Sequence, residues 1–401
     1  MVEPFLKLNA RSRRSRRGGG GNWLWPMLAV LAAGVLIWIW WQSAHTDTAP
    51  APQPVFTKPP ESLPVTKIEP PIKTTLKATN PPPTAIIRSN VPAPIPSVPR
   101  ILPATNVILK PMDKPVVRSA QTVLEAQIAL ASLGISTGPV DASMGSQTRA
   151  GIRAFQAREH LPVDGDLNEA TLQRLYLTQS TYSQYVVSQG DVARLSLPSS
   201  GWLEKSERES LDYESILELV AERFAASQGL IKGLNPGVSW TNVTAGTILK
   251  VPNTVRAVPR EKAASVRIHL ASKTLEAFGA KSNLLAHFPC SIARKVEKRP
   301  VGRLTVAKLA SNPNYVFDPD IYPESEEAKT IGHKLVIPPG PNNPVGTAWI
   351  GLDKPGYGIH GTPRPEHVGR TESHGCFRLA NWNAEYLIQL VWVGMPVYVD
   401  P

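Results

Sequence analysis

Hydrophobic residues change their spacing along this chain, and each change predicts a different structure. The first run, NWLWPMLAVLAAGVLIWIWW at residues 22–41, is almost entirely apolar and carries no charge. A helix of about 20 residues spans ~30 Å, the thickness of the hydrocarbon core of a bilayer. Tryptophans stand near both ends, as they do at membrane interfaces. The sequence therefore predicts a transmembrane helix over residues 22–41.

Residues 42–118 show no regular apolar period, and 18 of residues 50–115 are proline. Proline lacks a backbone N–H and fixes φ, so this segment cannot run as a helix or pack a core. We expect an extended, semi-rigid linker of up to ~3 Å per residue.

Helical spacing of apolar residues returns in residues 119–178, where it is carried by Leu124, Ile128, Leu133, Ile152, Phe155, Leu172 and Leu175. Gly134 is placed to end the first helix, and Asn168 or Asp166 to cap the last. The sequence predicts a compact three-helix unit. Its segments GPVD, TRAGIRAFQ and VDGDLNEATLQRL resemble peptidoglycan-binding domains.

Residues 183–254 read as a short strand (YVVSQGD), two helices and a second strand (GTILKVP). This order resembles a LysM module, a family that binds glycans containing N-acetylglucosamine. About 20 residues, including SSGWLEKSERESLD, intervene between the GD pair and the first expected helix, which departs from the family pattern.

Short alternating apolar runs bounded by Gly, Pro and Asn fill residues 262–401 and predict strands, among them SVRIHL, NLLAHFP, TAWIGL and MPVYV. One helix is expected at NWNAEYLIQLVWVG, with Asn381 capping its start and Gly394 closing its end. We expect a mostly β domain with one packed helix.

The net charge is +11, and five of the positive charges lie in RSRRSRR at residues 11–17. Arginines before the apolar run and none just after it predict a cytoplasmic tail at residues 1–21 and an extracytoplasmic chain beyond Gln42. A cleaved signal peptide is the alternative, but its apolar region would be shorter, and no small-x-small site follows Trp41. The basic charge thus needs no nucleic acid to explain it.

Three of the chain's 8 histidines and one of its 2 cysteines fall in YGIHGTPRPEHVGRTESHGCFRL, residues 357–379. If residues 373–376 are extended, His374 and Cys376 point to the same side, where the imidazole can take the thiol proton. Gly375 would leave backbone N–H groups accessible to an oxyanion. Arg378 is placed to hold a substrate carboxylate or carbonyl, and His360, followed by Gly361, lies on a separate predicted strand.

Two other interpretations of these residues are open. His360, His367, His374 and Cys376 include the ligand types of a zinc site, although their spacing is unlike the common paired-ligand patterns. Cys376 is alternatively a buried structural cysteine beside surface histidines. The second cysteine, Cys290 in AHFPCSIA, is expected to be a buried thiol on a strand with a raised pKa.

The order HGT, then SHGC followed by a hydrophobic residue and Arg, resembles the active-site signature of the L,D-transpeptidase (YkuD-type) catalytic domain. PPGPNNPVGTAWIGL ahead of it and GMPVYV behind it resemble the same family, so that the likeness covers about residues 266–399. It implies a β-sandwich-like L,D-transpeptidase fold. Asn383 stands where many members carry Asp, a difference expected to affect the helix start more than the chemistry.

The resemblance implies that Cys376 attacks a tetrapeptide stem, releases D-Ala and forms a thioester, which an amine then resolves into a 3→3 cross-link. His374 would act as base and then acid, and Gly375 would supply an oxyanion-binding N–H. Ser373 would give support, while His360, Gly361, Thr362 and Arg378 would bind substrate. No cofactor and no metal are implied.

Peptidoglycan stem peptides and glycan strands are the expected partners, and the bacterial inner membrane, with the folded domains in the periplasm, is the expected location. Two other functions are open: an L,D-carboxypeptidase that uses the same cysteine with water, and an inactive wall-anchoring protein. The acyl acceptor, whether a stem peptide, a lipoprotein or a D-amino acid, is also open.

Overall fold

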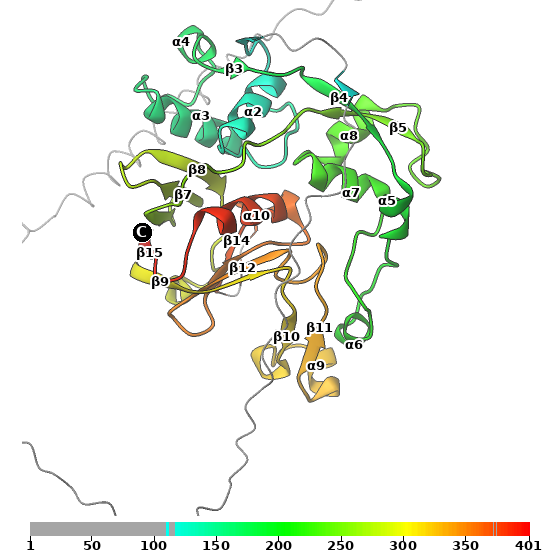
Figure 1. Ribbon diagram of the computed structural model, residues 1–401. Coiled ribbons are helices and arrows are strands. Elements are labelled where there is room, and N and C mark those ends of the chain that lie inside the picture. Colours follow the sequence, from blue (N-terminus) through cyan, green and yellow to red (C-terminus); the bar gives the residue numbers. More distant parts are fainter. Residues whose placement is uncertain (1–109, 112–116, 372, 374) are drawn as a thin grey trace, which may run out of the picture. The chain divides into compact units, whose positions relative to one another are not determined.

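The computed structural model describes residues 110–111, 117–371, 373 and 375–401 (Figure 1). The expected cytoplasmic tail and transmembrane helix lie outside the described residues, as do most of the expected linker and His374. Within the described ranges, no helix is both long enough and apolar enough to cross a bilayer.

Three helices form the unit expected at residues 119–178: α2 (Val123–Ser132), α3 (Ser146–Arg158) and α4 (Glu169–Leu172). Asn168 caps α4 by accepting a hydrogen bond from the backbone N–H of Thr171, as predicted. The strand β2 (Arg118–Ser119) pairs antiparallel with β3 (Tyr176–Leu177), which ties the two ends of the unit together.

Strand β4 (Tyr182–Val186) pairs antiparallel with β5 (Ile248–Pro252) and, on its other edge, with β1 (Lys110–Pro111). Between β4 and β5 lie the two expected helices, α7 (Ile216–Arg223) and α8 (Gln228–Leu234), each with a serine N-cap. Two short helices come before them, α5 (Gln189–Ala193) and α6 (Trp202–Ser206). These elements share one apolar core with the three-helix unit, so the two units pack as one body.

The C-terminal domain is mostly β, as predicted. Eight strands form one continuous, curled sheet in the order β14-β13-β12-β9-β15-β6-β7-β8. Their bounds are β6 (Ser265–His269), β7 (Thr274–Phe278), β8 (Leu284–Pro289), β9 (Gly302–Ser311), β12 (Ala348–Leu352), β13 (Gly358–His360), β14 (Phe377–Arg378) and β15 (Pro396–Asp400). Helix α10 (Asn381–Leu390) packs against this sheet and shares its apolar core (Figure 1).

The expected caps of α10 are wrong. Ala380, not Asn381, is its N-cap residue and makes no side-chain cap bond, and the helix ends at Leu390 rather than near Gly394. The amide oxygen of Asn381 instead accepts hydrogen bonds from the backbone N–H groups of Thr347 and Thr362. A tertiary partner has therefore replaced the local capping interaction.

The insertion between the GD pair and the first expected helix of residues 183–254 has a structural explanation. Helix α6 projects to a two-stranded antiparallel sheet of the C-terminal domain, made of β10 (Tyr315–Phe317) and β11 (Leu335–Ile337), beside α9 (Glu326–Ile331) (Figure 1). Trp202 of α6 stacks on Phe317 with ring centroids 4.3 Å apart. The extra residues thus connect two units of the chain.

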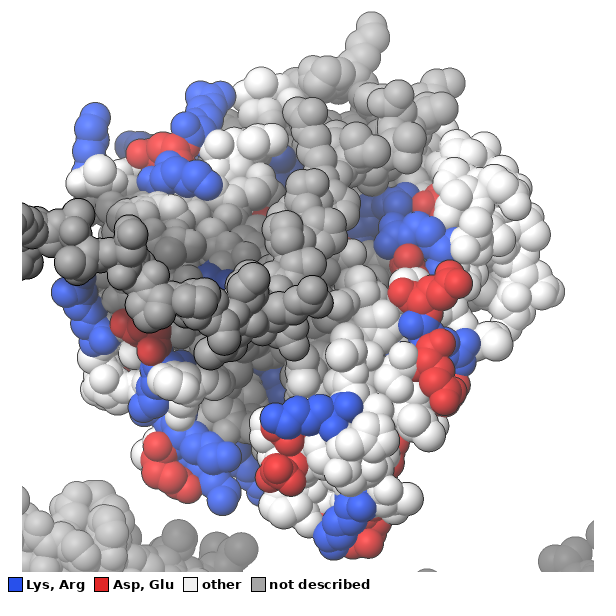
Figure 2. Space-filling model, turned by 60° about the horizontal axis from the view of Figure 1, so that its bottom comes forward, with Lys and Arg blue, Asp and Glu red and all other residues white. Residues whose placement is uncertain are grey.

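Basic and acidic side chains are interspersed on the described surface that Figure 2 shows. Five of the basic residues behind the net charge of +11 lie in residues 11–17, outside the described ranges.

Candidate active site around Cys376

The parallel pairing of β13 with β14 brings the two halves of the signature together. In this register Ile359 lies opposite Phe377, and His360 lies opposite Arg378. Ser291 flanks β14 on the other side and exchanges two backbone hydrogen bonds with Arg378, of 2.9 and 3.0 Å. Cys376, which immediately precedes β14, is therefore placed by backbone bonds on both sides.

The thiol of Cys376 is partly buried and donates a hydrogen bond to the carbonyl oxygen of Gly356 at 3.4 Å. Burial raises its pKa, while a hydrogen bond from the backbone of Gly358 and the positive charge of Arg378 act in the opposite direction. Among the described groups, the loss of hydration on burial outweighs both opposing effects. His374, the predicted base, lies outside the described residues.

His360 is buried and stacks on Trp349, with ring centroids 5.5 Å apart. Its Nδ1 lies 2.6 Å from the carbonyl oxygen of Gly361, and because a carbonyl only accepts, Nδ1 carries the proton. Burial, aided by the charge of Arg378, lowers the pKa of His360 to about 4. The imidazole is therefore neutral near pH 7, and its Nε2 is left as an acceptor.

Ser373 organises the turn before Cys376. Its hydroxyl donates to the carbonyl oxygen of Cys376 at 2.6 Å and accepts from the N–H of Gly375 at 3.2 Å. The Gly375 N–H, expected to face an oxyanion, is thus bonded to a side chain in this structure. Backbone bonds to Ile292 and Arg294 hold Ser373 itself in place.

Arg378 is half-buried, and burial lowers the pKa of its guanidinium. Within the described part of the chain, no carboxylate lies within ion-pair distance of it. A half-buried cation without a counter-ion among the described residues is suited to a substrate carboxylate or carbonyl oxygen.

Asn381 contacts both Gly361 and Thr362. The N–H of Thr362 donates to the Asn381 amide oxygen at 3.0 Å, and a Cβ added at Gly361 would lie 2.3 Å from that oxygen. Sequence reasoning treated Asn381 only as a helix cap and did not single out Trp349. A polar residue at the expected helix start, two residues after SHGCFRL, was the available signal for Asn381.

His367 is a further candidate ligand in the zinc interpretation of the signature residues. His367 ends a 3-10 turn, Pro365–His367, and its nearest acidic partner is Glu366 at 3.8 Å. Among the described residues, no group of three or more His, Cys, Asp or Glu is arranged to hold a metal ion.

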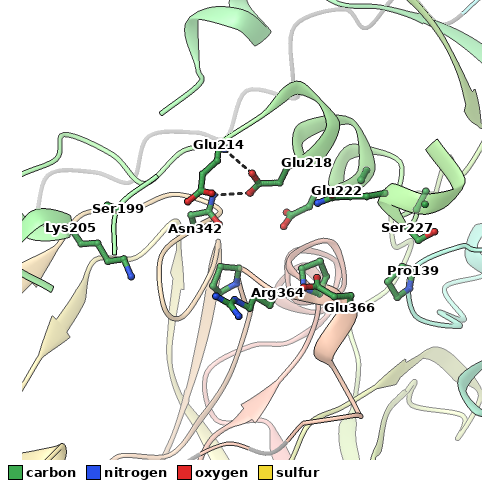
Figure 3. A pocket seen from close by; sticks show the side chains of 16 residues that line it. Pro139, Ser199, Lys205, Glu214, Glu218, Glu222, Ser227, Asn342, Arg364 and Glu366 are labelled. Carbon is green, nitrogen blue, oxygen red and sulfur yellow. Dashed lines mark hydrogen bonds between the residues drawn. The ribbon is translucent and has the colours of Figure 1, made fainter. Parts of the chain in front are cut away.

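A cavity of about 590 Å³ lies apart from Cys376, between helix α7 and the segment that follows Thr362 (Figure 3). Glu218 and Glu222 line one wall, and Arg364 and Glu366 lie across from them (Figure 3). The amide of Asn342 donates to Glu218 at 2.7 Å, so a loop of the β domain contacts α7 at this cavity.

Residues 263–399 match the family of L,D-transpeptidase catalytic domains, named YkuD. This chain contains an L,D-transpeptidase catalytic domain. Residues 119–175 match a second family, described as "Putative peptidoglycan binding domain". The transpeptidase domain therefore coincides with the curled sheet, and the peptidoglycan-binding domain with the three-helix unit.

Curated relatives are similar over part of the chain. "Putative L,D-transpeptidase YkuD" of Bacillus licheniformis is 24% identical over 185 residues, which is 46% of this chain and 93% of the relative. "Putative L,D-transpeptidase YqjB" of Bacillus subtilis is 38% identical over 92 residues, or 20% of this chain and 52% of the relative. "Probable L,D-transpeptidase YbiS" of Escherichia coli is 28% identical over 46% of this chain and 60% of its own length.

A solved structure, an L,D-transpeptidase from Mycobacterium smegmatis, is 21% identical and covers 38% of this chain and 66% of that one. Its TM-score of 0.27 is low, so the domain assignment rests on the family match and the curated relatives.

Proposed function

We propose that this protein is a cell-wall L,D-transpeptidase that joins peptidoglycan stem peptides by 3→3 cross-links through a thioester on Cys376. The observation that carries the proposal is the β13–β14 pairing, which sets His360 beside Arg378 next to a partly buried thiol. This arrangement lies within a domain of the L,D-transpeptidase family.

In the first step, the sulfur of Cys376 attacks the carbonyl carbon that precedes the terminal D-Ala. Because burial raises the pKa of this thiol, attack needs a base to take its proton, and we assign that role to His374. The C–N bond then breaks, D-Ala leaves with the proton from His374, and a thioester remains.

In the second step, the amine of an acceptor stem attacks the thioester carbon and gives a proton to His374. The C–S bond breaks, and the proton returns to the sulfur. No net oxidation or reduction occurs, and the amide bond lost in the first step is replaced by the amide of the cross-link.

The remaining site residues would bind and orient the donor stem. The guanidinium of Arg378 would hold a stem carboxylate, and the Nε2 acceptor of neutral His360 would receive a hydrogen bond from an amide N–H. Ser373 would keep the carbonyl of Cys376 turned away from the incoming substrate through its 2.6 Å bond.

The test is incubation of the protein with disaccharide-tetrapeptides followed by mass spectrometry of the products. Release of D-Ala with a 3→3 linked dimer is expected, and neither is expected from Cys376→Ala. Tripeptide monomers without dimers would identify an L,D-carboxypeptidase instead. An absence of any product from folded wild-type protein would favour a wall-anchoring role.

We further propose that residues 119–178 and 183–254 hold the enzyme on its polymeric substrate. The support is the peptidoglycan-binding family match and the β4-α7-α8-β5 arrangement, whose strands are antiparallel neighbours. Co-sedimentation with insoluble peptidoglycan should be reduced by soluble N-acetylglucosamine oligomers. Sedimentation that these oligomers leave unchanged would contradict glycan binding by the LysM-like unit.

For the location, we propose a single-pass protein of the bacterial inner membrane, anchored by residues 22–41, with its folded domains in the periplasm. The support is the uncharged run after RSRRSRR. Protease added to intact spheroplasts should digest the C-terminal domains. Full protection of these domains would contradict this topology.

A further inference from the structure

The carboxamide of Asn381 links two loops of the transpeptidase domain, residues 338–347 and the loop that contains Thr362, to helix α7. Its oxygen accepts from the N–H groups of Thr362 at 3.0 Å and Thr347 at 3.3 Å. Its nitrogen donates to the carbonyl of Pro341 at 3.0 Å and to the carboxylate of Glu222 at 3.1 and 3.3 Å. Asn381 is 1% exposed, so its carboxamide makes these hydrogen bonds in a buried position.

The hydrogen-bond network of Asn381 reaches the candidate site through Gly361 and His360. Gly361 lies so close to Gly346 and Asn381 that a Cβ on it would be 3.2 Å from the Gly346 Cα and 2.3 Å from the Asn381 oxygen. The carbonyl of the same Gly361 holds Nδ1 of His360 at 2.6 Å. A shift of the Asn381 carboxamide therefore moves the backbone that orients the His360 ring.

Glu222 is an unusual partner for such a network. It is 6% exposed, and no Lys, Arg or His of the described residues forms an ion pair with it. Burial raises its pKa well above the usual range, and the nearby carboxyls Glu385, Glu218 and Glu366 act in the same direction. A buried acid without a counter-ion costs stability.

Among the described residues, no group of the LysM-like unit donates a hydrogen bond to the Glu222 side chain. Its described hydrogen bonds come from Asn381 of the transpeptidase domain. The acid faces the cavity between α7 and the segment after Thr362, and it points toward the transpeptidase domain (Figure 3). Its described hydrogen bonds are therefore with Asn381, which binds the backbone of Thr362, and not with its own unit.

We propose that Glu222, supplied by the LysM-like unit, is a positioning residue for the transfer reaction. It holds the amide of Asn381, which holds Gly361 and Thr362 and through them His360. The proposal rests on the proposed function and extends it: the LysM-like unit completes the catalytic geometry in addition to any role in binding the wall.

The test uses the full chain and compares Glu222→Ala, Glu222→Asp and Glu222→Gln with wild type. The Gln side chain keeps an oxygen that can accept a hydrogen bond from Asn381. The Asp side chain is one methylene shorter, so its oxygens lie farther from Asn381, and Ala has no acceptor. We expect Glu222→Ala and Glu222→Asp to lose ~10-fold or more in kcat, with KM for the tetrapeptide changed less than ~3-fold. Glu222→Gln should keep kcat within ~3-fold of wild type.

Glu214→Gln is the matched control, because Glu214 lines the same cavity and makes no described contact with Asn381. It should leave kcat unchanged. Alkylation of Cys376 by iodoacetamide should proceed at the wild-type rate in each variant, which shows that the nucleophile and its surroundings remain folded. Should Glu222→Ala fail to fold, the comparison of Glu222→Asp with Glu222→Gln decides the question.

Equal kcat values for Glu222→Asp, Glu222→Gln and wild type would overturn the proposal. So would a loss in Glu222→Gln as large as in Glu222→Asp, because the retained acceptor would then have no effect. An inactive wild-type protein would instead count against the proposed function, so the two failures are distinguishable.

Discussion

Cys290 and Cys376 stand on neighbouring segments of one sheet, since Ser291 pairs with Arg378. Cys290 is 0% exposed, donates only to the carbonyl of Ser291 at 3.4 Å, and has a pKa raised by burial alone. Cys376 is partly exposed, and a backbone N–H and a guanidinium oppose the effect of burial on its pKa. Both thiols are free.

The difference shows what separates a structural thiol from a candidate nucleophile in the same apolar sheet. Burial disfavours the thiolate in both places, so desolvation does not distinguish them. Solvent access and polar neighbours distinguish the two thiols. A nucleophile needs a path for its substrate and nearby groups that stabilise negative charge. Cys290 has neither among the described residues.

The largest expected effect is on turnover. Cys376→Ser should lower the rate of D-Ala release by ~1,000-fold or more, because an alcohol replaces the thiol that a base must activate. Cys290→Ser should keep the rate within ~3-fold. D-Ala release by both variants, measured on the same tetrapeptide, makes the comparison. Loss of turnover in a well-folded Cys290→Ser protein would contradict the structural role of Cys290.

Thiol labelling should separate the two residues in the native protein. Cys376 should react with a small alkylating reagent at least ~100-fold faster than Cys290, which should become reactive only on unfolding. Peptide mapping after timed alkylation measures both rates in one sample. Similar rates at the two positions would show that the two thiols do not differ in accessibility and reactivity.

A smaller effect is expected from the second buried titratable group near Cys376. The pKa of His360 is about 4, so as the pH falls below ~6.5 the unfolded chain takes up a proton that native His360 does not. Stability from this group is present above pH ~6.5 and is lost as the pH falls toward 4, in total on the order of 3 kcal/mol.

Urea unfolding of wild type and His360→Gln between pH 7 and 4 tests this expectation. The stability difference between the two proteins should shrink as the pH falls, because the variant lacks the titrating ring. Parallel curves for the two proteins would show that His360 does not titrate with a depressed pKa.

The smallest effect concerns the stability of the Cys290 site. Cys290→Ser should reduce the free energy of unfolding by about 1–2 kcal/mol, because a hydroxyl loses more hydration than a thiol when it is buried. The carbonyl of Ser291 offers that hydroxyl one acceptor, which limits the loss. Denaturant unfolding at pH 7 measures this loss of unfolding free energy. An unchanged midpoint would mean that water reaches the side chain at position 290.

Much of the local structure was accessible from the sequence. Alternating runs predicted most of the strands of the transpeptidase domain, and the spacing of Leu124 and Ile128 predicted α2. The position before an apolar-periodic segment predicted a cap at Asn168 or Asp166, and the structure has it at Asn168. The roles of Asn381 and Glu222 were not accessible, because their partners lie far away in the sequence.

What the sequence by itself determined is the set of chemical groups and their local order: a thiol after Ser-His-Gly, an imidazole before Gly-Thr, and strands to carry them. Only the tertiary structure decided which groups meet. Parallel pairing of β13 and β14 sets His360 opposite Arg378, and burial raises the pKa of Cys376. The physical reason is that hydrogen-bond partners and hydration depend on distances in space, and the fold brings distant segments together to set them.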